Sequence, residues 1–291
     1  LSSGGQSTQA FPDFNNIEGW AQCDEAILGS YVASGSGILS HITFKAKNIG
    51  ESSLTFDTVD LRDLDNDPIS ATIENGTVTV GEVLAKVKIW LEGPYQAGGS
   101  MTTSLNTGGY IPTTSPYSDG RTVSSVPNGI TDWIFVELRS TPGGTAVGRE
   151  SFFIKSDGNI ADIDGSTTDL AFGGVADGNY YIVVKHLNHL AVMSANAVAL
   201  NGLSAALYDF TSGSDKYYGA GGVKELESGV WGMYGGDCNQ DGNITVADNN
   251  IIMNNRNDEG YEDGDINLDG NVTVADNNKC MNNRNKGTQV P

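Results

Sequence analysis

A duplicated segment near the C-terminal end constrains the fold more than any other feature of this sequence. The chain reads GDCNQDGNITVAD over residues 236–248 and GDINLDGNVTVAD over residues 264–276, with a period of 28 residues. Over the longer windows 236–258 and 264–286, 17 of 23 positions are identical. We interpret the pair as two copies of one structural unit.

Each copy has the spacing of a calcium-binding loop. A hard cation such as calcium takes about six to eight oxygen ligands, which alternate residues of a short loop supply, and glycine at the sixth position allows the sharp turn. The side chains at loop positions 1, 3, 5 and 12 and the main-chain carbonyl at position 7 are the expected ligands. These residues are Asp237, Asn239, Asp241, Asn243 and Asp248 in the first copy and Asp265, Asn267, Asp269, Asn271 and Asp276 in the second. The sequence therefore predicts two bound calcium ions.

The two copies also share a loop-then-helix order. Position 12 is Asp instead of Glu, and glycine-rich coil precedes each loop where a helix-loop-helix calcium hand would have an entering helix. This pattern, given twice, resembles a type I dockerin domain over about 50 of the 291 residues. That family binds two calcium ions and docks onto a cohesin, so the resemblance implies partner-binding residues at Val246, Ala247, Val274 and Ala275. The alternative is that the loops only stabilise a small domain.

The chain has three cysteines, an odd number, at Cys23, Cys238 and Cys280. In dockerins the two loop-helix units pack antiparallel, and the resemblance therefore implies that a Cys238–Cys280 disulfide is geometrically feasible. Cys23 would then remain unpaired, and three free thiols are the alternative. No CxxC spacing occurs, so no zinc site is predicted.

The first 80 residues carry alternating apolar and polar residues that predict half-buried strands over 36–47, 53–62 and 71–80. The runs GILSHITFKAK, VDLRDLDNDPI and NGTVTV resemble the closing strands of a cohesin module in order and spacing. The early strands of that family have no counterpart upstream of Phe11. The resemblance implies an incomplete sandwich with an open edge, completed either by preceding sequence or by a strand from another chain.

Short patterns in this same segment suggest modification. Asp57-Thr-Val59 resembles O-glycan acceptor sites of Bacteroidetes, which implies an acceptor at Thr58, and Asn75-Gly-Thr77 is an N-glycan acceptor pattern at Asn75. An acidic cluster nearby either holds a further calcium ion or is a solvated loop, and we favour the solvated loop. The cluster consists of Asp57, Asp60, Asp63, Asp65 and Asp67.

Residues 81–235 are predicted to form a second antiparallel β-sandwich. Strand patterns over 85–91, 132–139, 149–155 and 180–186 are separated by turns rich in Gly, Pro, Asn and Asp. The runs KVKIWLEGPY, DWIFVELR and GNYYIVVKHLNHLAVMS resemble a module that precedes C-terminal dockerin-like or sorting regions in secreted proteins of Bacteroidetes and related bacteria. That family carries no assigned activity.

Several side chains of this middle segment are candidates for a site, and for each we favour a structural role. His186 and His189 are three residues apart, so in one strand they would face opposite sides and make a poor metal site. Trp90, Trp133 and Phe153 stand at strand positions that we expect in the core. A carbohydrate platform would instead need exposed loop aromatics, for which the candidates are Tyr110, Tyr117, Tyr217 and Tyr218.

Composition limits the classes of partner. The chain has 36 Asp and Glu against 16 Lys and Arg, a formal net charge of −20, which disfavours nucleic acid and anionic membranes as partners. No run of about 18 apolar residues occurs that would predict a membrane span. The chain begins at Leu1 without an initiator Met or a signal segment, which we interpret as a processed or truncated product. Calcium loops of this kind suit the extracellular space, so we expect an extracellular protein.

These features predict a mainly β protein with three domains: residues 1–80 as a partial cohesin-like sandwich, 81–235 as a second sandwich and 236–291 as a dockerin-like calcium domain. No Gly-x-Ser-x-Gly elbow or phosphate-binding glycine loop occurs, so we expect no enzyme. The expected function is calcium-dependent protein assembly on a bacterial surface or matrix. Self-assembly would give head-to-tail filaments, with residues 1–10 as a free donor strand. The alternative is a carbohydrate-binding or enzyme-anchoring component of a cellulosome-like scaffold, with glycan partners.

Overall fold

The computed structural model describes residues 8–15, 20–27, 49–63, 65–219 and 221–291. The chain divides into two compact units, Leu1–Thr79 and Val80–Pro291, which we call unit 1 and unit 2. The protein is mainly β, as the sequence predicts.

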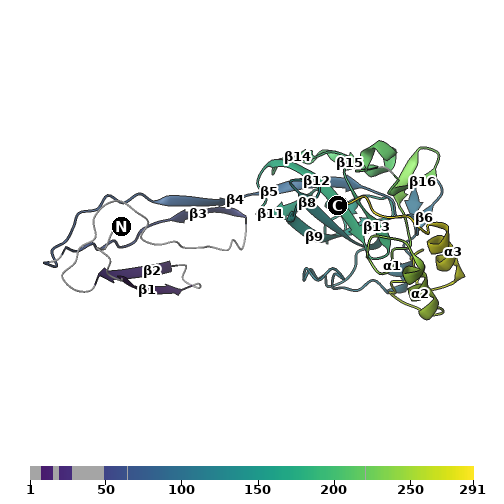
Figure 1. The fold of residues 1–291 in the computed structure, drawn as a ribbon, viewed down its shortest axis with the longest axis horizontal. Coiled ribbons are helices and arrows are strands. Elements are labelled where there is room, and N and C mark those ends of the chain that lie inside the picture. Colours follow the sequence, from purple (N-terminus) through teal and green to yellow (C-terminus); the bar gives the residue numbers. More distant parts are fainter. Residues whose placement is uncertain (1–7, 16–19, 28–48, 64, 220) are drawn as a thin grey trace. The chain divides into compact units, whose positions relative to one another are not determined.

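The described residues of unit 1 form two separate two-stranded sheets (Figure 1). Strands β1 (Thr8–Asn15) and β2 (Trp20–Ile27) pair antiparallel, with Thr8 opposite Ile27 and Asn15 opposite Trp20. Strands β3 (Gly50–Leu54) and β4 (Gly76–Val80) form the other pair. Residues 8–10 are therefore already paired within their own chain, which contradicts the expectation that residues 1–10 are a free donor strand. The part of that segment before Thr8 lies outside the described residues.

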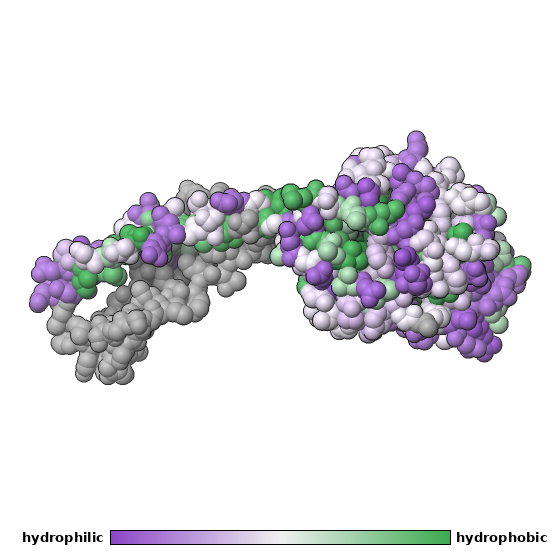
Figure 2. All heavy atoms as spheres, turned by 90° about the horizontal axis from the view of Figure 1, so that it is seen from above, coloured by the Kyte–Doolittle hydropathy of each residue, from purple (hydrophilic) through white to green (hydrophobic). Residues whose placement is uncertain are grey.

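The described residues of unit 1 between 49 and 78 are all exposed. Figure 2 shows hydrophobic residues on this surface. The predicted strand over 53–62 is wrong beyond Leu54, and the one predicted over 71–80 begins only at Gly76. Within the part of unit 1 that the structure describes, no apolar layer packs against this segment, so the alternating pattern does not produce two half-buried strands there. The strand predicted over 36–47 lies outside the described residues.

The strands of unit 2 form one six-stranded sheet and several smaller ones. In the large sheet the order is β10-β9-β8-β12-β13, with β14 also paired to β12, and all these pairs are antiparallel. Its members are β8 (Ile130–Arg139), β9 (Ala146–Lys155), β10 (Ile160–Ala161), β12 (Gly178–His186), β13 (His189–Met193) and β14 (Val198–Leu200).

A three-stranded sheet has the order β11-β5-β15. Its members are β5 (Glu82–Lys88), β11 (Leu170–Gly173) and β15 (Leu207–Asp209). Strand β11 is antiparallel to β5, whereas β15 is parallel to it and departs from the expected antiparallel pattern. A parallel pair needs a long crossover connection, and the whole large sheet lies between β5 and β15 in the sequence.

The core of unit 2 lies between these two sheets. Strand β5 alternates strictly, burying Val83, Ala85 and Val87, and β8 is buried along nearly its whole length. The Trp133 and Phe153 rings are 4.1 Å apart, and both side chains are fully buried, as predicted. Trp90 is also in this core. Burial of each such large side chain contributes about 1.5–3 kcal/mol to stability.

Short elements complete unit 2. They are β6 (Tyr95–Gln96), β7 (Ser100–Met101), α1 (Ser104–Gly108), the 3-10 turns η1 (Phe210–Ser212) and η2 (Ser214–Lys216), and the hairpin of β16 (Val223–Glu227) and β17 (Val230–Met233). The last two are the helices α2 (Val246–Asn254) and α3 (Val274–Asn282), one in each copy of the repeat.

The C-terminal repeat shares a hydrophobic core with the sandwich. Leu190 of β13 and Tyr234, which follows β17, belong to the same buried cluster as repeat residues. The repeat members are Cys238, Ile244, Ile252, Ile266, Val272 and Cys280. Residues 236–291 therefore pack against the sandwich within one compact unit.

Candidate metal-binding loops and the buried polar network

The two copies of the repeat fold into the same backbone path. We call residues 237–248 loop 1 and residues 265–276 loop 2. At position 4 of the loops, Gln240 and Leu268 have φ values of 58° and 55°, and at position 6 Gly242 and Gly270 have φ values of 85° and 90°. Two left-handed residues at matching positions bend each loop in the same way.

Each loop ends in the first turn of its helix. Thr245 caps α2 and Thr273 caps α3, and in both helices the aspartate at loop position 12 completes a capping box. Asp248 Oδ2 accepts from the Thr245 N–H at 2.8 Å, and Asp276 Oδ2 accepts from the Thr273 N–H at 2.9 Å. The helix start therefore holds the last carboxylate of each loop in place, which the sequence analysis did not recognise although the Thr-x-x-Asp spacing is its signal.

Four carboxylates are buried in these loops, a costly arrangement without a cation. They are Asp237, Asp248, Asp265 and Asp276. In the described part of the chain, none of them forms an ion pair with Lys, Arg or His. A buried, ionised carboxylate is stable only when it is paired or bound to a metal.

The first carboxylate of each loop shows the cost most clearly. Burial, together with the nearby charge of Asp248, raises the pKa of Asp237 to about 7. Burial also raises the pKa of Asp265 to about 7, with a further contribution from Asp276. Asp237 Oδ2 accepts from the Gly242 N–H at 3.1 Å, but its Oδ1 is buried without a hydrogen-bond partner. A divalent cation would supply the missing partner.

The remaining predicted ligands close the loops around these carboxylates. Asn239 donates from Nδ2 to Asp241 Oδ2 at 3.0 Å, and Asn267 donates from Nδ2 to Asp269 Oδ2 at 2.9 Å. Residues 243 and 271, whose carbonyls are the expected main-chain ligands, donate their N–H groups to Asp241 and Asp269. The donor set of carboxylate, amide and carbonyl oxygens fits calcium, and the individual ligands stay predictions.

A metal site could also be made of acidic, histidine and cysteine side chains alone. Nowhere in the described residues do three or more such side chains gather closely enough to hold a metal ion. In the loops, the carboxylates at position 5 accept hydrogen bonds from the main-chain N–H groups of residues 243 and 271. A bound ion would therefore depend on amide and main-chain oxygens as well.

The predicted docking residues lie on the surface of the two helices. Val246 and Val274 are 48% and 56% exposed, and Ala247 and Ala275 are exposed as well. The sequence analysis missed two further apolar side chains, Met253 and Met281, which are 47% and 41% exposed. Each stands seven residues after the valine of its helix, about two turns further along the same side. The sequence signal for them is that methionine occupies the same position in both copies of the repeat.

The two helices are in contact at equivalent positions. Asn277 of α3 donates from Nδ2 to Asn249 Oδ1 of α2 at 2.5 Å, and these residues correspond in the repeat. The apolar side chains of the two helices are thus related by the internal duplication. We call Val246, Met253, Val274 and Met281 the helix face.

The disulfide considered from the sequence is not formed in the structure. Cys238 and Cys280 are free thiols, both buried in the cluster that the repeat shares with the sandwich. Cys280 Sγ lies 3.8 Å from the Gly236 carbonyl oxygen. Burial raises the pKa of both thiols, that of Cys280 to about 11, and the two behave as small apolar core residues. The Cys23 side chain lies outside the described residues.

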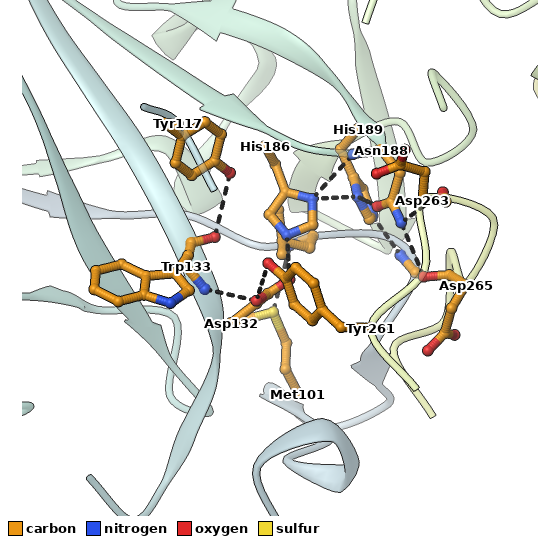
Figure 3. Close-up of polar contacts among 12 residues, drawn as sticks. Met101, Tyr117, Asp132, Trp133, His186, Asn188, His189, Tyr261, Asp263 and Asp265 are labelled. Carbon is orange, nitrogen blue, oxygen red and sulfur yellow. Dashed lines mark hydrogen bonds and ion pairs between the residues drawn. The ribbon is translucent and has the colours of Figure 1, made fainter. Parts of the chain in front are cut away.

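A buried polar network joins the sandwich to loop 2 (Figure 3). His189 Nε2 accepts from the Gly93 N–H at 2.9 Å, so its proton is on Nδ1, which faces Asn188 Oδ1 at 2.8 Å and His186 Nδ1 at 3.1 Å. His186 then donates from Nε2 to Asp132 Oδ2 at 3.1 Å. The chain turns between the two histidines, so their rings face each other, and both have hydrogen-bond partners within the protein.

The network reaches the repeat through two side chains. Tyr261 donates from its hydroxyl to Asp132 Oδ1 at 2.8 Å. Asn188 donates from Nδ2 to the Asp263 and Asp265 carbonyls at 3.2 and 2.9 Å. Loop 2 is therefore anchored beside its first predicted ligand. Sequence reasoning missed Asp132, Asn188 and Tyr261 because their partners lie up to 129 residues away.

The loop tyrosines do not form an exposed platform. Tyr217 is buried, and Tyr117 stacks on Phe135 with ring centroids 5.2 Å apart. Tyr110 is 39% exposed, and Gly108 and Gly270 lie close to its ring. The structure therefore supports the structural role that we favour for these residues.

The two predicted glycosylation positions, Thr58 and Asn75, are exposed in unit 1. Asn75 Oδ1 accepts from the Phe56 N–H at 3.1 Å. Modification of either residue stays a prediction. Asp63 accepts from the N–H groups of Asp65 and Asp67, so part of the acidic cluster is a hydrogen-bonded loop in solvent.

Comparisons with known proteins give no family for this chain. No protein-family model matches it, and no curated protein matches it in sequence. Two crystal structures with similarity are N-terminal and C-terminal interface mutants of a type II Cohesin-X-Dockerin complex from Acetivibrio cellulolyticus. Both are 16% identical over 70% of this chain, cover 97% and 96% of the other chain, and have TM-scores of 0.35 and 0.37. At this distance the likeness carries no argument about what this chain binds.

Proposed function

We propose that this protein is a non-enzymatic, extracellular assembly protein whose C-terminal repeat binds two calcium ions and then docks onto a protein partner. The buried carboxylates of loops 1 and 2 support the calcium sites, because they have no other cation in the described part of the chain. Calcium bound at both loops would hold α2 and α3 in one arrangement. The helix face would then be presented as a fixed surface.

The observation that carries this proposal is the duplicated helix face. Val246 of α2 corresponds to Val274 of α3, and Met253 of α2 corresponds to Met281 of α3. All four side chains are about half exposed. Apolar side chains that recur at equivalent positions of a repeat and remain in solvent are typical of a binding surface. Methionine suits such a surface because its flexible side chain adapts to a partner.

We propose that the partner is a second copy of this chain, bound through unit 1. The apolar side chains of unit 1 are exposed at the described positions 49–78, and among the described residues each of its sheets has two strands. The exposed set includes Leu54, Phe56, Val59, Leu61, Ile69, Ile73 and Val78. A neighbour that covers these residues in each subunit would produce a head-to-tail polymer.

Calcium and assembly are linked in this proposal by thermodynamics. A ligand that binds only the folded state at 100 times its dissociation constant stabilises it by about 2.7 kcal/mol per site. Burial of the helix face against a neighbouring copy would add further stabilisation to that from calcium. Copies that each carry a formal charge of −20 repel one another, and bound calcium reduces that charge.

Light scattering of the full chain tests the proposal. We expect the particle mass to grow with protein concentration in millimolar calcium and to fall again after chelation. Val246→Asp with Val274→Asp should abolish this growth, and aspartate in the first helical turn should leave the helices folded. Leu203→Asp is the matched control, because Leu203 is 92% exposed and stands between β14 and β15, outside α2 and α3.

The outcomes separate the parts of the proposal. A chain that stays monomeric at high concentration in calcium contradicts self-assembly, and the helix face would then serve a different protein. Equal loss of assembly in Leu203→Asp contradicts the assignment to the helix face. The glycan-binding alternative is not supported by any particular observation, since Tyr117 and Tyr217 are packed into the core.

A further inference from the structure

Three side chains from distant parts of unit 2 meet between the β16–β17 hairpin and the end of α3. Lys224 is on β16, Asn283 is the C-terminal cap of α3, and Glu92 follows β5. Lys224 Nζ lies 3.4 Å from Asn283 Oδ1 and 3.4 Å from Glu92 Oε1. Asn283 Nδ2 lies 2.5 Å from Glu92 Oε2. An amine, a carboxamide and a carboxylate are thus in mutual contact.

The orientation of the Asn283 amide is fixed by its surroundings. Nδ2 donates to Glu92 Oε2 and also to the Gly235 carbonyl at 2.8 Å, and a carbonyl can only accept. The amide oxygen therefore faces Lys224. Asn283 is fully buried, so its carboxamide cannot rotate freely or exchange these partners for water.

Glu92 is placed to act on both reacting groups. Its Oε2 accepts from the Gly235 N–H at 3.1 Å, and its side chain is 12% exposed. One carboxylate oxygen contacts the amine and the other contacts the amide nitrogen. A general base must lie within hydrogen-bond reach of the proton that it removes, and Glu92 contacts both the amine of Lys224 and the amide nitrogen of Asn283.

We propose that Lys224 and Asn283 form an intramolecular isopeptide bond, with Glu92 as the proton carrier. A bond forms between Lys224 Nζ and Asn283 Cγ, and the Cγ–Nδ2 bond breaks. The lysine ammonium loses two of its protons, which leave with Nδ2 as ammonium. Glu92 takes protons from Nζ through Oε1 and delivers them to Nδ2 through Oε2, and it ends as the carboxylate with which it began.

The bond would tie the C-terminal repeat to the sandwich. It would join residues 59 positions apart and connect β16 directly to the end of α3. The repeat would then stay attached to the sandwich when calcium is removed. This inference does not depend on self-assembly or on the identity of any partner.

A second lysine–glutamate pair in unit 2 provides a matched control. Lys185 Nζ lies 2.6 Å from Glu137 Oε1, and Glu137 also pairs with Arg139 at 2.8 Å. In the described residues neither Lys185 nor Glu137 contacts a side-chain amide. The same charge pairing is present there without a side-chain amide carbon that the lysine could attack, so no isopeptide bond can form.

Intact-mass spectrometry of the folded full chain, after incubation in calcium, tests the proposal. We expect the measured mass to be lower than the sequence mass by one ammonia, and protease digestion to give a branched peptide that joins residues 224 and 283. Lys224→Arg and Glu92→Gln should each restore the full sequence mass, and Lys185→Arg should retain the loss. Circular dichroism of each variant shows that it is folded.

The opposite results would overturn the proposal. A folded wild-type chain with the full sequence mass contradicts it directly. A mass loss that persists in Lys224→Arg also contradicts it, because succinimide formation at the Asn–Gly sequences of this chain releases ammonia too. If Glu92→Gln is folded and still forms the branched peptide, the role assigned to Glu92 is wrong.

Discussion

Unit 1 and unit 2 contain strand patterns of the same kind, but in the described residues these patterns are buried in unit 2 and exposed in unit 1. In unit 2, alternation along β5 buries Val83, Ala85 and Val87 beneath a second sheet. In unit 1, a comparable alternation leaves Leu54 and Phe56 in solvent. The difference teaches that period-two alternation predicts a half-buried strand only where a second layer exists. In our account, the second layer of unit 1 comes from a neighbouring copy.

The largest expected effect comes from a substitution in the core of unit 2, compared with one at an exposed position of unit 1. Trp133→Ala should lower the free energy of unfolding of unit 2 by about 3–5 kcal/mol, because it leaves a large cavity. Phe56 is in unit 1, and its side chain is 61% exposed. Phe56→Ala should therefore change the free energy of unfolding of unit 1 by less than about 0.5 kcal/mol in the monomer. Urea unfolding of the calcium-loaded monomer measures both. A loss above about 2 kcal/mol for Phe56→Ala would show that unit 1 has its own core.

Removal of calcium should also act on unit 2 alone. Chelation from a free concentration of 100 times the dissociation constant should cost about 2.7 kcal/mol for each independent site. Asp241→Ala with Asp269→Ala should reproduce the loss, whereas His186→Ala should leave the metal content unchanged. Calorimetry with and without chelator, together with metal analysis, gives the answer. Unfolding that is insensitive to calcium would contradict both sites.

These two predictions differ in how far the sequence could support them. The calcium loops depend on residues within 12 positions of one another, so their spacing was readable in the sequence. The anchors of those loops were not, because Tyr261 reaches Asp132 and Asn283 reaches Glu92 across more than 120 residues. The sequence pattern of a strand predicts which of its faces is buried. The hydrogen-bond partner of a buried polar side chain depends on the fold, which brings two distant segments together.

Acid should weaken unit 2 through a buried histidine. Burial, and the nearby charges of His186 and Lys279, hold the pKa of His189 well below its usual value. The folded state therefore keeps His189 neutral, and its contribution to stability is present above the unfolded pKa of about 6.5 and is lost as the pH falls below it. The slope is at most about 1.4 kcal/mol per pH unit.

His189→Gln provides the control for this prediction, since glutamine is neutral at every pH. Its unfolding free energy should vary less between pH 7 and pH 5 than that of the wild type when both are measured in urea at fixed calcium. An identical pH profile for the two proteins would show that another group is responsible. His186 faces His189 at 3.1 Å, so His186→Gln should be measured alongside it.

The smallest expected effect concerns the helix caps. Thr245→Ala should cost about 1 kcal/mol, because it removes the hydroxyl that accepts from the Ala247 N–H at 3.1 Å. Thr273→Ala should cost the same in the second copy, where the matching distance is also 3.1 Å. Thr58→Ala, at an exposed position of unit 1, is the control and should have no measurable effect. Unequal costs in the two copies would show that the duplicated units are not energetically equivalent.

Hydrogen exchange of the full chain tests the central claim most directly, namely that a calcium-loaded neighbour covers unit 1. The amides of β3 and β4 should exchange quickly at low protein concentration and in chelator. They should become protected as protein concentration rises in calcium, and Val246→Asp with Val274→Asp should prevent this protection. Exchange of β3 and β4 that is independent of protein concentration and of calcium would contradict the account.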